Sequence, residues 1–239
     1  GSGIDSAESI QLTSDGGYIV EGRTASSASG DVTSTTKGGT DYWAIKLTAL
    51  GAISWQNNYG GSADDYAYSI LQTSDGGYIM TGNTLSSASG DVTGTTIGSN
   101  DVWVVKLTDA GAISWQKNYG GSGIDSAESI QQTSDGGYIM AGSTYSSASG
   151  NVTGTTKGGE DVWVVKLTAS GAISWQNNYG GIGRDYAKSI RQTADGNYIV
   201  TGTSAHASAG NGDQAGVVSR GGFDIWFFTI DENGAILAP

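Results

Sequence analysis

The sequence predicts an all-β fold, a β-propeller-like array of four four-stranded antiparallel blades of about 60 residues each. Two observations predict it. The 239-residue chain repeats one pattern at a fixed interval, and its strand-like segments are separated by turns rich in glycine, which occurs 40 times. We expect a single domain, 1–239, made of repeats 1–61, 62–121, 122–181 and 182–239.

Recurring aspartate and tryptophan residues set the interval of the repeat. Tryptophan recurs every 60 residues at Trp55, Trp115 and Trp175, and aspartate does so at Asp15, Asp75, Asp135 and Asp195. A second tryptophan series, through Trp43, Trp103, Trp163 and Trp226, reaches the fourth repeat after 63 residues instead of 60. The fourth repeat therefore contains a three-residue insertion, which lies between His206 and Phe223.

The third repeat shows how each copy divides into strands. Residues 128–133 and 138–144 flank an Asp-Gly pair, which between alternating segments predicts a hairpin with a type I′ turn. A polar loop covers residues 145–160. Residues 161–167 predict a third strand that is apolar on both sides, and residues 172–179 predict a fourth. Because one copy cannot bury such a third strand alone, the blades are expected to pack against one another.

The segments SIQQTSDGGYIMAGST and DVWVVKLTASGAISWQNNYGG resemble the sixty-residue propeller repeats of secreted and surface proteins of bacteria and archaea. The resemblance covers essentially the whole chain. Its motifs Asp-Gly-Gly-Tyr-Ile, Trp-Val-Val-Lys-Leu and Ile-Ser-Trp-Gln are specific for the repeat type. The resemblance implies a propeller in an extracellular or cell-surface protein, and it brings no active site with it. An exported parent protein would have lost its leader or carry it outside this sequence.

The two ends of the chain leave the size of the array open. In the fourth repeat, Phe227-Phe228 replaces Val-Val, and Ile236-Leu237 stands where Ile-Ser-Trp-Gln is expected, as in a capping or ring-closing blade. The first repeat begins like the third and shows no such divergence. A closed ring of four blades, part of a longer propeller, and self-association through the end repeats all remain expectations.

Charge and composition exclude several function classes. The formal net charge is −12, which would repel a polyanion, so we expect no binding of nucleic acid or of an anionic membrane surface. No run of eighteen apolar residues occurs, so membrane insertion is not expected. The chain has no cysteine and a single histidine, which excludes disulfides and centres built from cysteine or several histidines.

No recognisable catalytic group appears in the sequence, and we therefore expect that the chain is not an enzyme. His206 is the only imidazole that could activate a serine, and it lies in a loop of small residues. The aspartates recur once per repeat, which favours structural roles in the hairpin turns and at the start of the third strands. The Gly-Gly pairs between repeats are expected to form turns rather than phosphate-binding loops.

Structural calcium is the one cofactor that the sequence suggests. Calcium takes about six to eight oxygen ligands, and the long loops combine Ser-Gly-Asp-Val-Thr or Ser-Gly-Asn-Val-Thr segments with nearby aspartates. The candidate ligands are Asp31, Asp41, Asp91, Asp101, Asn151 and Asp161. The alternative is a loop folded by side-chain to backbone hydrogen bonds, because no Asp-x-Asp-x-Asp-Gly run is present.

The expected topology places a binding face at the long loops. In up-and-down blades these loops share a face with the blade-to-blade connections, while the tight turns lie on the other face. Residues of the loop face that differ between repeats are candidates for recognising a protein or a glycan. They are Tyr66, Tyr68, Tyr145, Tyr186, His206 and Arg220, together with Lys188 and Arg191.

These observations favour a non-enzymatic structural or interaction module of an extracellular or cell-surface protein, used for adhesion, display or assembly. A carbohydrate-binding, lectin-like propeller is one alternative, although the tryptophans fall at repeated strand positions and are expected mainly in the core. A subunit of an extracellular filament or sheet is another alternative.

Overall fold

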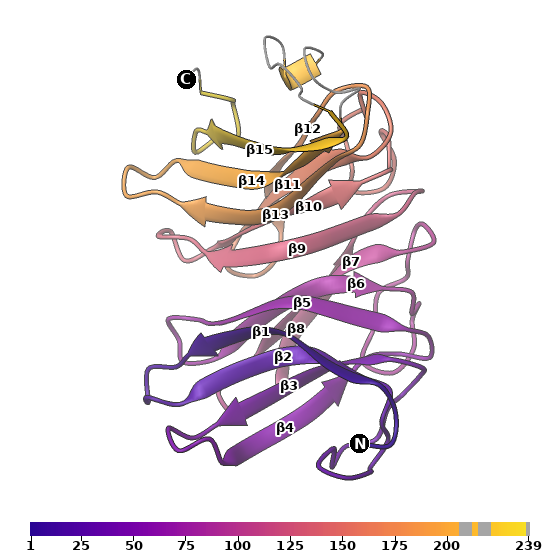
Figure 1. Cartoon of the computed structure of the whole chain (residues 1–239), viewed down its shortest axis with the longest axis vertical. Helices are drawn as coiled ribbons and strands as arrows, with labels where there is room; N and C mark the ends of the chain where they lie inside the picture. Colours follow the sequence, from indigo (N-terminus) through magenta and orange to yellow (C-terminus); the bar gives the residue numbers. More distant parts are fainter. Residues whose placement is uncertain (206–211, 215–220, 238–239) are drawn as a thin grey trace. The chain divides into compact units, whose positions relative to one another are not determined.

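The computed structural model describes residues 1–205, 212–214 and 221–237, which form β-strands and one 3₁₀ turn, η2 (Gly212–Gln214). The chain divides into two compact units (Figure 1). Unit 1 comprises Gly1–Thr96 and Asn100–Tyr119, and unit 2 comprises Ile97–Ser99 and Gly120–Pro239. Among the described residues, no helix is both long and apolar enough to cross a membrane.

Unit 1 contains two four-stranded antiparallel sheets in which consecutive strands are neighbours. Sheet 1 consists of β1 (Asp5–Leu12), β2 (Tyr18–Thr24), β3 (Asp41–Leu47) and β4 (Ile53–Tyr59). Sheet 2 consists of β5 (Asp65–Gln72), β6 (Tyr78–Thr84), β7 (Asp101–Leu107) and β8 (Ile113–Tyr119). The prediction of an all-β chain of antiparallel sheets is thus confirmed.

Unit 2 contains one four-stranded and one three-stranded antiparallel sheet. Sheet 3 consists of β9 (Asp125–Gln132), β10 (Tyr138–Thr144), β11 (Asp161–Leu167) and β12 (Ile173–Tyr179). Sheet 4 consists of β13 (Asp185–Gln192), β14 (Tyr198–Ala205) and β15 (Phe223–Ile230). The prediction of four strands in the fourth repeat is wrong for the described residues, because after the turn at Asp231 only Ile236 forms an isolated bridge, to Ile230.

The predicted type I′ hairpin turn is also wrong. A type I′ turn needs positive φ at two central residues, but in sheet 2 only Gly76 has it, at 83°, while Asp75 does not. The Gly76 amide donates to the Thr73 carbonyl at 2.9 Å, so the hairpin is a type I turn followed by a left-handed glycine. Asp75 selects this geometry because its Oδ1 accepts bonds from Thr73 Oγ1 at 2.5 Å and the Gly77 amide at 3.1 Å.

The first strand of each sheet contains a β-bulge, which the sequence pattern concealed. In sheet 3 the register shifts between Ala127 and Ser129, which leaves Glu128 as the extra residue. The strand therefore begins at Asp125, three residues earlier than predicted, because alternation is lost at the bulge. Strands β10 and β11 have the predicted bounds, and β12 begins one residue later than predicted.

Packing between the two sheets of each unit explains the apolar third strands. In unit 1, β5 packs across β1, β2 and β3, and in unit 2, β13 packs across β9, β10 and β11. This packing buries Tyr42 and Ala44 of β3 together with Ile70 of β5 in unit 1, and Val162 and Val164 of β11 together with Ile190 of β13 in unit 2. Because burying one large apolar side chain contributes about 1.5–3 kcal/mol, these strands supply much of the stability of each unit.

Polar ends of aromatic side chains fix the register between the sheets. In unit 1, Tyr42 Oη donates to the Trp103 carbonyl at 3.2 Å, and Tyr59 Oη donates to the Gly111 carbonyl at 2.6 Å. The Trp55 indole donates to the Asp109 carbonyl at 3.1 Å. Each of these bonds ties a residue of sheet 1 to a backbone group of sheet 2, so they align one blade with the next.

A buried lysine in the third strand of sheets 1 to 3 pairs with the hairpin aspartate of its own sheet. In sheet 2, Lys106 is 5% exposed, and its Nζ lies 2.9 Å from Asp75 Oδ2. Bonds from Thr73 and Lys106 hold the pKa of Asp75 at about 2, although burial opposes the shift. The pKa of Asp135, beside Lys166, is lowered to about 2 in the same way.

We expect Asp75→Asn to lower the unfolding free energy at pH 7 by about 1–3 kcal/mol, because a buried ammonium loses its carboxylate partner. The folded pKa lies below the unfolded value of about 3.9, so this contribution is present above that pH and is lost as the pH falls towards 2. Urea unfolding between pH 2.5 and 7, with the exposed Asp31→Asn as control, measures it. Equal stability of D75N and wild type at pH 7 would contradict this account.

Candidate functional site

The bulge residues of the four first strands are chemically varied. They are Glu8, Tyr68, Glu128 and Lys188, each the extra residue where the strand register shifts. A bulge re-aims a side chain and increases the local twist, which is why bulges are common beside binding sites. Glycine is required opposite the bulge: a Cβ on Gly82 would lie 2.0 Å from the Tyr66 carbonyl oxygen. The same β-bulge therefore presents a different side chain from one sheet to the next.

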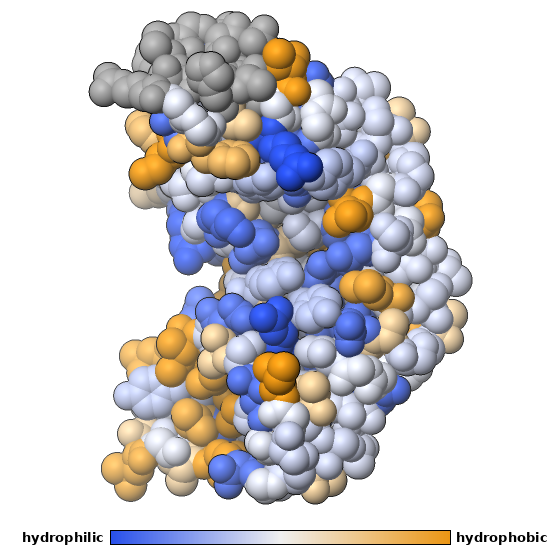
Figure 2. Space-filling model, turned by 45° about the vertical axis from the view of Figure 1, so that its right-hand side comes forward, coloured by the Kyte–Doolittle hydropathy of each residue, from blue (hydrophilic) through white to orange (hydrophobic). Residues whose placement is uncertain are grey.

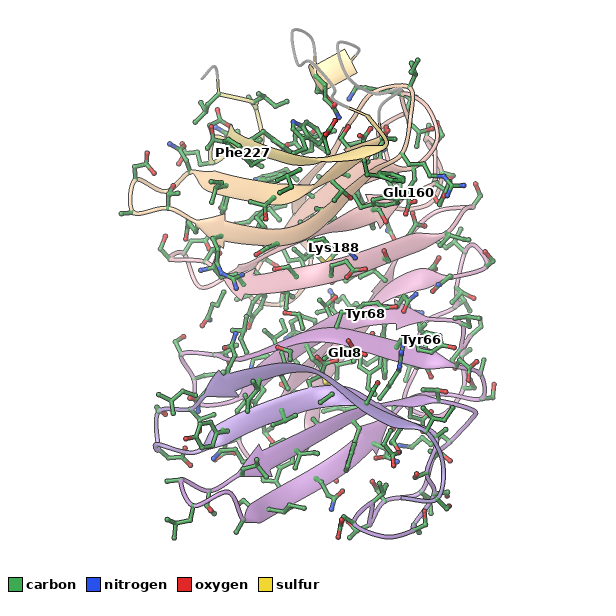
Figure 3. The ribbon with its side chains drawn as sticks, viewed as in Figure 1. Glu8, Tyr66, Tyr68, Glu160, Lys188 and Phe227 are labelled. Atoms are coloured by element: carbon green, nitrogen blue, oxygen red, sulfur yellow. The ribbon has the colours of Figure 1, made fainter. Side chains whose placement is uncertain are left out.

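In unit 1 the re-aimed side chain lines a pocket between the two sheets. The pocket measures about 470 Å³ and is lined by Ile4, Arg23, Ala25 and Thr40 of the first repeat and by Tyr66, Tyr68 and Asn83 of the second. Figure 3 shows Tyr66 and Tyr68 together on β5 and Glu8 on the neighbouring β1. Two of the eight residues predicted for recognition, Tyr66 and Tyr68, thus line the same pocket.

Hydrogen bonds and charges hold the pocket walls in place. Tyr66 Oη donates to Asp64 Oδ2 at 3.1 Å, and Asp64 Oδ1 accepts from the Thr40 amide at 2.8 Å. The Arg23 guanidinium lies 5.2 Å from the centre of the Tyr66 ring, a cation–π distance. Burial, followed by the bond to Asp64, raises the pKa of Tyr66, so its hydroxyl remains protonated.

Asn83 gives the pocket an amide whose bonding capacity is not used up. Its side chain is 6% exposed, and its Oδ1 atom has no hydrogen-bond partner among the described residues. A buried acceptor without a donor costs about 1–3 kcal/mol. A ligand hydroxyl or amide that donated to this oxygen would recover that energy.

The corresponding junction in unit 2, between sheets 3 and 4, is lined by different side chains. The Arg184 guanidinium lies 5.9 Å from the centre of the Tyr145 ring, and a hydrogen bond to Tyr186 raises the pKa of Arg184. The Tyr186 ring lies 5.8 Å from that of Phe223. Glu160, labelled in Figure 3, accepts a bond of 2.6 Å from Ser143 Oγ. Tyr145 and Tyr186, predicted independently, therefore meet around one arginine.

Buried carboxylates join the long loops to the connections beside these junctions. Asp65 Oδ2 accepts bonds from the Gly61 amide at 2.7 Å and from Ser86 Oγ at 3.0 Å, while Oδ1 accepts from Thr84 Oγ1. At the unit 2 junction the corresponding carboxylate, Asp185, accepts bonds from the Gly181 amide and from Gln214 Nε2, both at 2.9 Å. The bond to the connecting glycine therefore recurs at both junctions, whereas the partners from the long loop differ.

The predicted calcium ligands are mostly engaged in folding the loops. Asp91 Oδ2 lies 2.6 Å from Lys37 Nζ and accepts a bond of 3.2 Å from the Gly60 amide. Asn151 Oδ1 accepts a bond of 3.3 Å from the Gly120 amide. Asp31 is exposed, and its carbonyl accepts a bond from Gln56. Asp101 is fully buried.

Asp41 and Asp161 are the calcium candidates whose carboxylates are incompletely bonded. Both are fully buried, and each Oδ2 accepts a backbone bond of 2.7 Å while Oδ1 has no partner among the described residues. Burial raises the pKa of both to about 6. In the described part of the chain, no group of three or more acidic or histidine side chains is arranged to hold a metal ion. Calcium binding stays a prediction.

Asp41→Asn is expected to raise the unfolding free energy at pH 7.5 in EDTA by about 1–3 kcal/mol. The folded pKa of about 6 lies above the unfolded value, so wild-type stability falls as the pH rises from about 4 to about 6, and the asparagine variant escapes that loss. The two proteins should be equally stable at pH 4. Chemical denaturation at both pH values measures the difference, and a destabilised D41N together with calcium-dependent wild-type stability would show that the carboxylate holds an ion.

The remaining predicted residues have other neighbours or lie outside the described residues. Lys188 pairs with Glu128 at 3.1 Å, and Arg191 donates to the carbonyl of Ile190 at 2.8 Å. His206 and Arg220 lie outside the described residues. Sequence reasoning missed Arg23, Asn83 and Arg184. These positions also differ between repeats, which could have marked them as candidates. Only the pairing of the strands shows that they lie beside the tyrosines at the junctions.

The tryptophans divide into two structural classes. Trp103 and Trp163 of the third strands are fully buried, as predicted. Trp55 and Trp175 of the fourth strands are half-buried, and each indole donates to a turn carbonyl of the following sheet. Their rings are therefore committed to contacts between sheets, and the tyrosines form the aromatic walls of the junctions.

Comparison with known proteins identifies the fold. No family model matches the chain, and no curated protein is similar to it in sequence. A protein of unknown function from Bacteroides caccae is similar in structure, with a TM-score of 0.50 and 12% identity over 98% of this chain and 60% of that chain. The chain thus spans less than two thirds of that protein.

Two further solved structures are similar. A candidate exo-beta-1,3-galactanase from Bifidobacterium bifidum s17 has a TM-score of 0.51 and 11% identity, covering 98% of this chain and 72% of that chain. The WD40 domain of Neurospora crassa Pan2 has a TM-score of 0.41 and 12% identity, covering 98% of this chain and 65% of that chain. The fold of this chain is propeller-like, with repeated antiparallel blades.

These similarities correct the expectation that the chain is not an enzyme. That expectation rested on the absence of a local catalytic motif, but the same fold occurs in the candidate galactanase. A propeller can draw side chains for a site from several blades, so a missing local motif does not exclude catalysis. At 11% identity the likeness shows the fold alone and assigns no reaction to this chain.

Proposed function

We propose that this chain is an interaction module of an extracellular or cell-surface protein, and that it recognises its partner at the inter-sheet junctions. The observation that carries the proposal is the unit 1 pocket lined by Arg23, Tyr66, Tyr68 and Asn83. It lies where bulges re-aim variable side chains on a repeated scaffold, which is the arrangement expected of a recognition surface. Adhesion or display at a cell surface would use such a module.

Carbohydrate is the ligand class that the chemistry of this pocket favours. Tyrosine rings offer apolar faces for sugar rings together with hydroxyl groups that bond to sugar hydroxyls. The unpartnered Asn83 Oδ1 would accept from a sugar hydroxyl, and Arg23 would donate to a sugar oxygen. The volume of about 470 Å³ is in the range of small-ligand pockets.

Substitutions taken from the chain's own repeats test the proposal without disturbing the fold. Tyr66→Ser and Tyr68→Glu introduce the residues that the first and third repeats carry at these positions. We expect the double variant to bind its best oligosaccharide about tenfold more weakly, because it loses the aromatic walls. Binding is measured on an array of immobilised oligosaccharides and then by calorimetry in solution.

Ile97→Lys is the control, because the first and third repeats carry Lys37 and Lys157 at this position and Ile97 does not line the unit 1 pocket. It should leave binding at the unit 1 pocket unchanged. Equal loss in both variants would show that the pocket is not the site. Binding of no oligosaccharide would remove the carbohydrate assignment and leave a protein partner as the ligand of the module.

A further inference from the structure

Sheet 1 leaves uncovered a face whose counterpart in sheet 2 is buried. Ile10 is 62% exposed and Tyr18 is 36% exposed, whereas Ile70 and Tyr78, at the same repeat positions, are 0% and 2% exposed. In unit 1, Ile70 and Tyr78 are buried in the core cluster that also contains Tyr42 and Ala44 of the preceding sheet. The uncovered side of sheet 1, here called the head face, is made of Ile10, Leu12 and Tyr18.

Sheet 4 leaves uncovered the other side of the sheet, which in sheet 3 packs against the following sheet. Ile225 is 84% exposed and Phe227 is 68% exposed, although both lie in strand β15. Figure 3 labels Phe227 on this strand. The same repeat positions in sheet 3, Val162 and Val164, are buried in the core cluster that contains Ile190 of the following sheet. The uncovered side of sheet 4, here called the tail face, is made of Ile225 and Phe227.

The head and tail faces are the two halves of one kind of interface. In each unit, the side of a sheet that matches the tail face packs against the side of the next sheet that matches the head face. The chain therefore shows twice what covers each face, namely a sheet of its own type. Figure 2 shows hydrophobic residues gathered over the first sheet, where the head face lies.

Both end faces are more apolar than their internal counterparts. The head face has Leu12 where the other repeats have glutamine, and the tail face has Phe227 where the first three repeats have alanine or valine. The internal glutamine is used for polar contacts, since Gln72 accepts a bond of 2.8 Å from the Ser14 amide. Terminal repeats that face water are capped with polar residues. These substitutions go the opposite way, as expected for faces that become buried.

We propose that the tail face of one copy of this chain docks on the head face of a second copy. Because the two faces differ, the contact is heterologous, and repeated contacts would produce a closed ring or a linear assembly. The interaction is independent of the ligand pocket proposed above. Closure of one chain on itself and covering by a flanking repeat of a longer protein are the alternative occupants.

Light scattering with two disabled variants tests the proposal. The wild type should exceed 24.3 kDa and gain mass with concentration. The head variant Ile10→Ser/Leu12→Gln and the tail variant Ile225→Ser/Phe227→Ser should each remain at 24.3 kDa alone. Mixed in equal amounts, they should form a species of twice that mass and nothing larger. The intact tail face of the head variant can dock on the intact head face of the tail variant, and no further intact face remains.

Ile97→Lys is the matched control, because Ile97 is half-exposed and the first and third repeats carry lysine there. It should assemble like the wild type. If either double variant fails to fold by circular dichroism, L12Q and F227V replace it, since both introduce residues found at those positions in other repeats. A wild type that stays at 24.3 kDa up to about 1 mM, or a mixture that does not double in mass, would overturn the proposal.

Discussion

The packing of a first strand across the preceding sheet is the contact on which the rest of each unit depends. In unit 1, Tyr42 and Ala44 of β3 are buried together with Ile70 of β5, and in unit 2, Val162 and Val164 of β11 are buried together with Ile190 of β13. Without a neighbouring sheet, each blade would expose apolar side chains, and the favourable free energy of burying them would be lost. The aromatic hydroxyls and indoles that reach backbone carbonyls of the next sheet then fix how the blades are aligned.

This constraint separates the residues of the repeat into two groups. Residues that make the contact keep their role: Tyr59 donates to the Gly111 carbonyl, Tyr179 at the same repeat position donates to the Gly234 carbonyl, and the glycine opposite each bulge has no room for a side chain. Residues at the bulge itself are free to differ, as Tyr68 and Lys188 do, because the bulge lifts them out of the ladder. Recognition chemistry can therefore change from one junction to the next without a change in the scaffold.

The charged groups show the same separation between scaffold and site. Lysines such as Lys106 are tolerated in the interior because a turn carboxylate neutralises them, and this pairing favours the ionised aspartate. Asp41 is also buried but lacks a full set of partners, so burial raises its pKa to about 6 and its ionisation above that pH lowers the stability of the fold. The fold thus contains carboxylates that stabilise it above pH 4 and others whose ionisation opposes it.

The sequence by itself determined the repeat, the antiparallel strands and the burial of Trp103 and Trp163, because these follow from local periodicity and composition. Strands β10 and β11 could be bounded to the residue. The bulges, the hairpin turn type and the three-stranded sheet 4 could not, because each depends on hydrogen bonds between segments. The sequence also suggested Tyr66 and Tyr68, but only the tertiary structure brought them together with Arg23 and Asn83. These residues come from different sheets, and their proximity is decided by how two blades pack rather than by spacing along the chain.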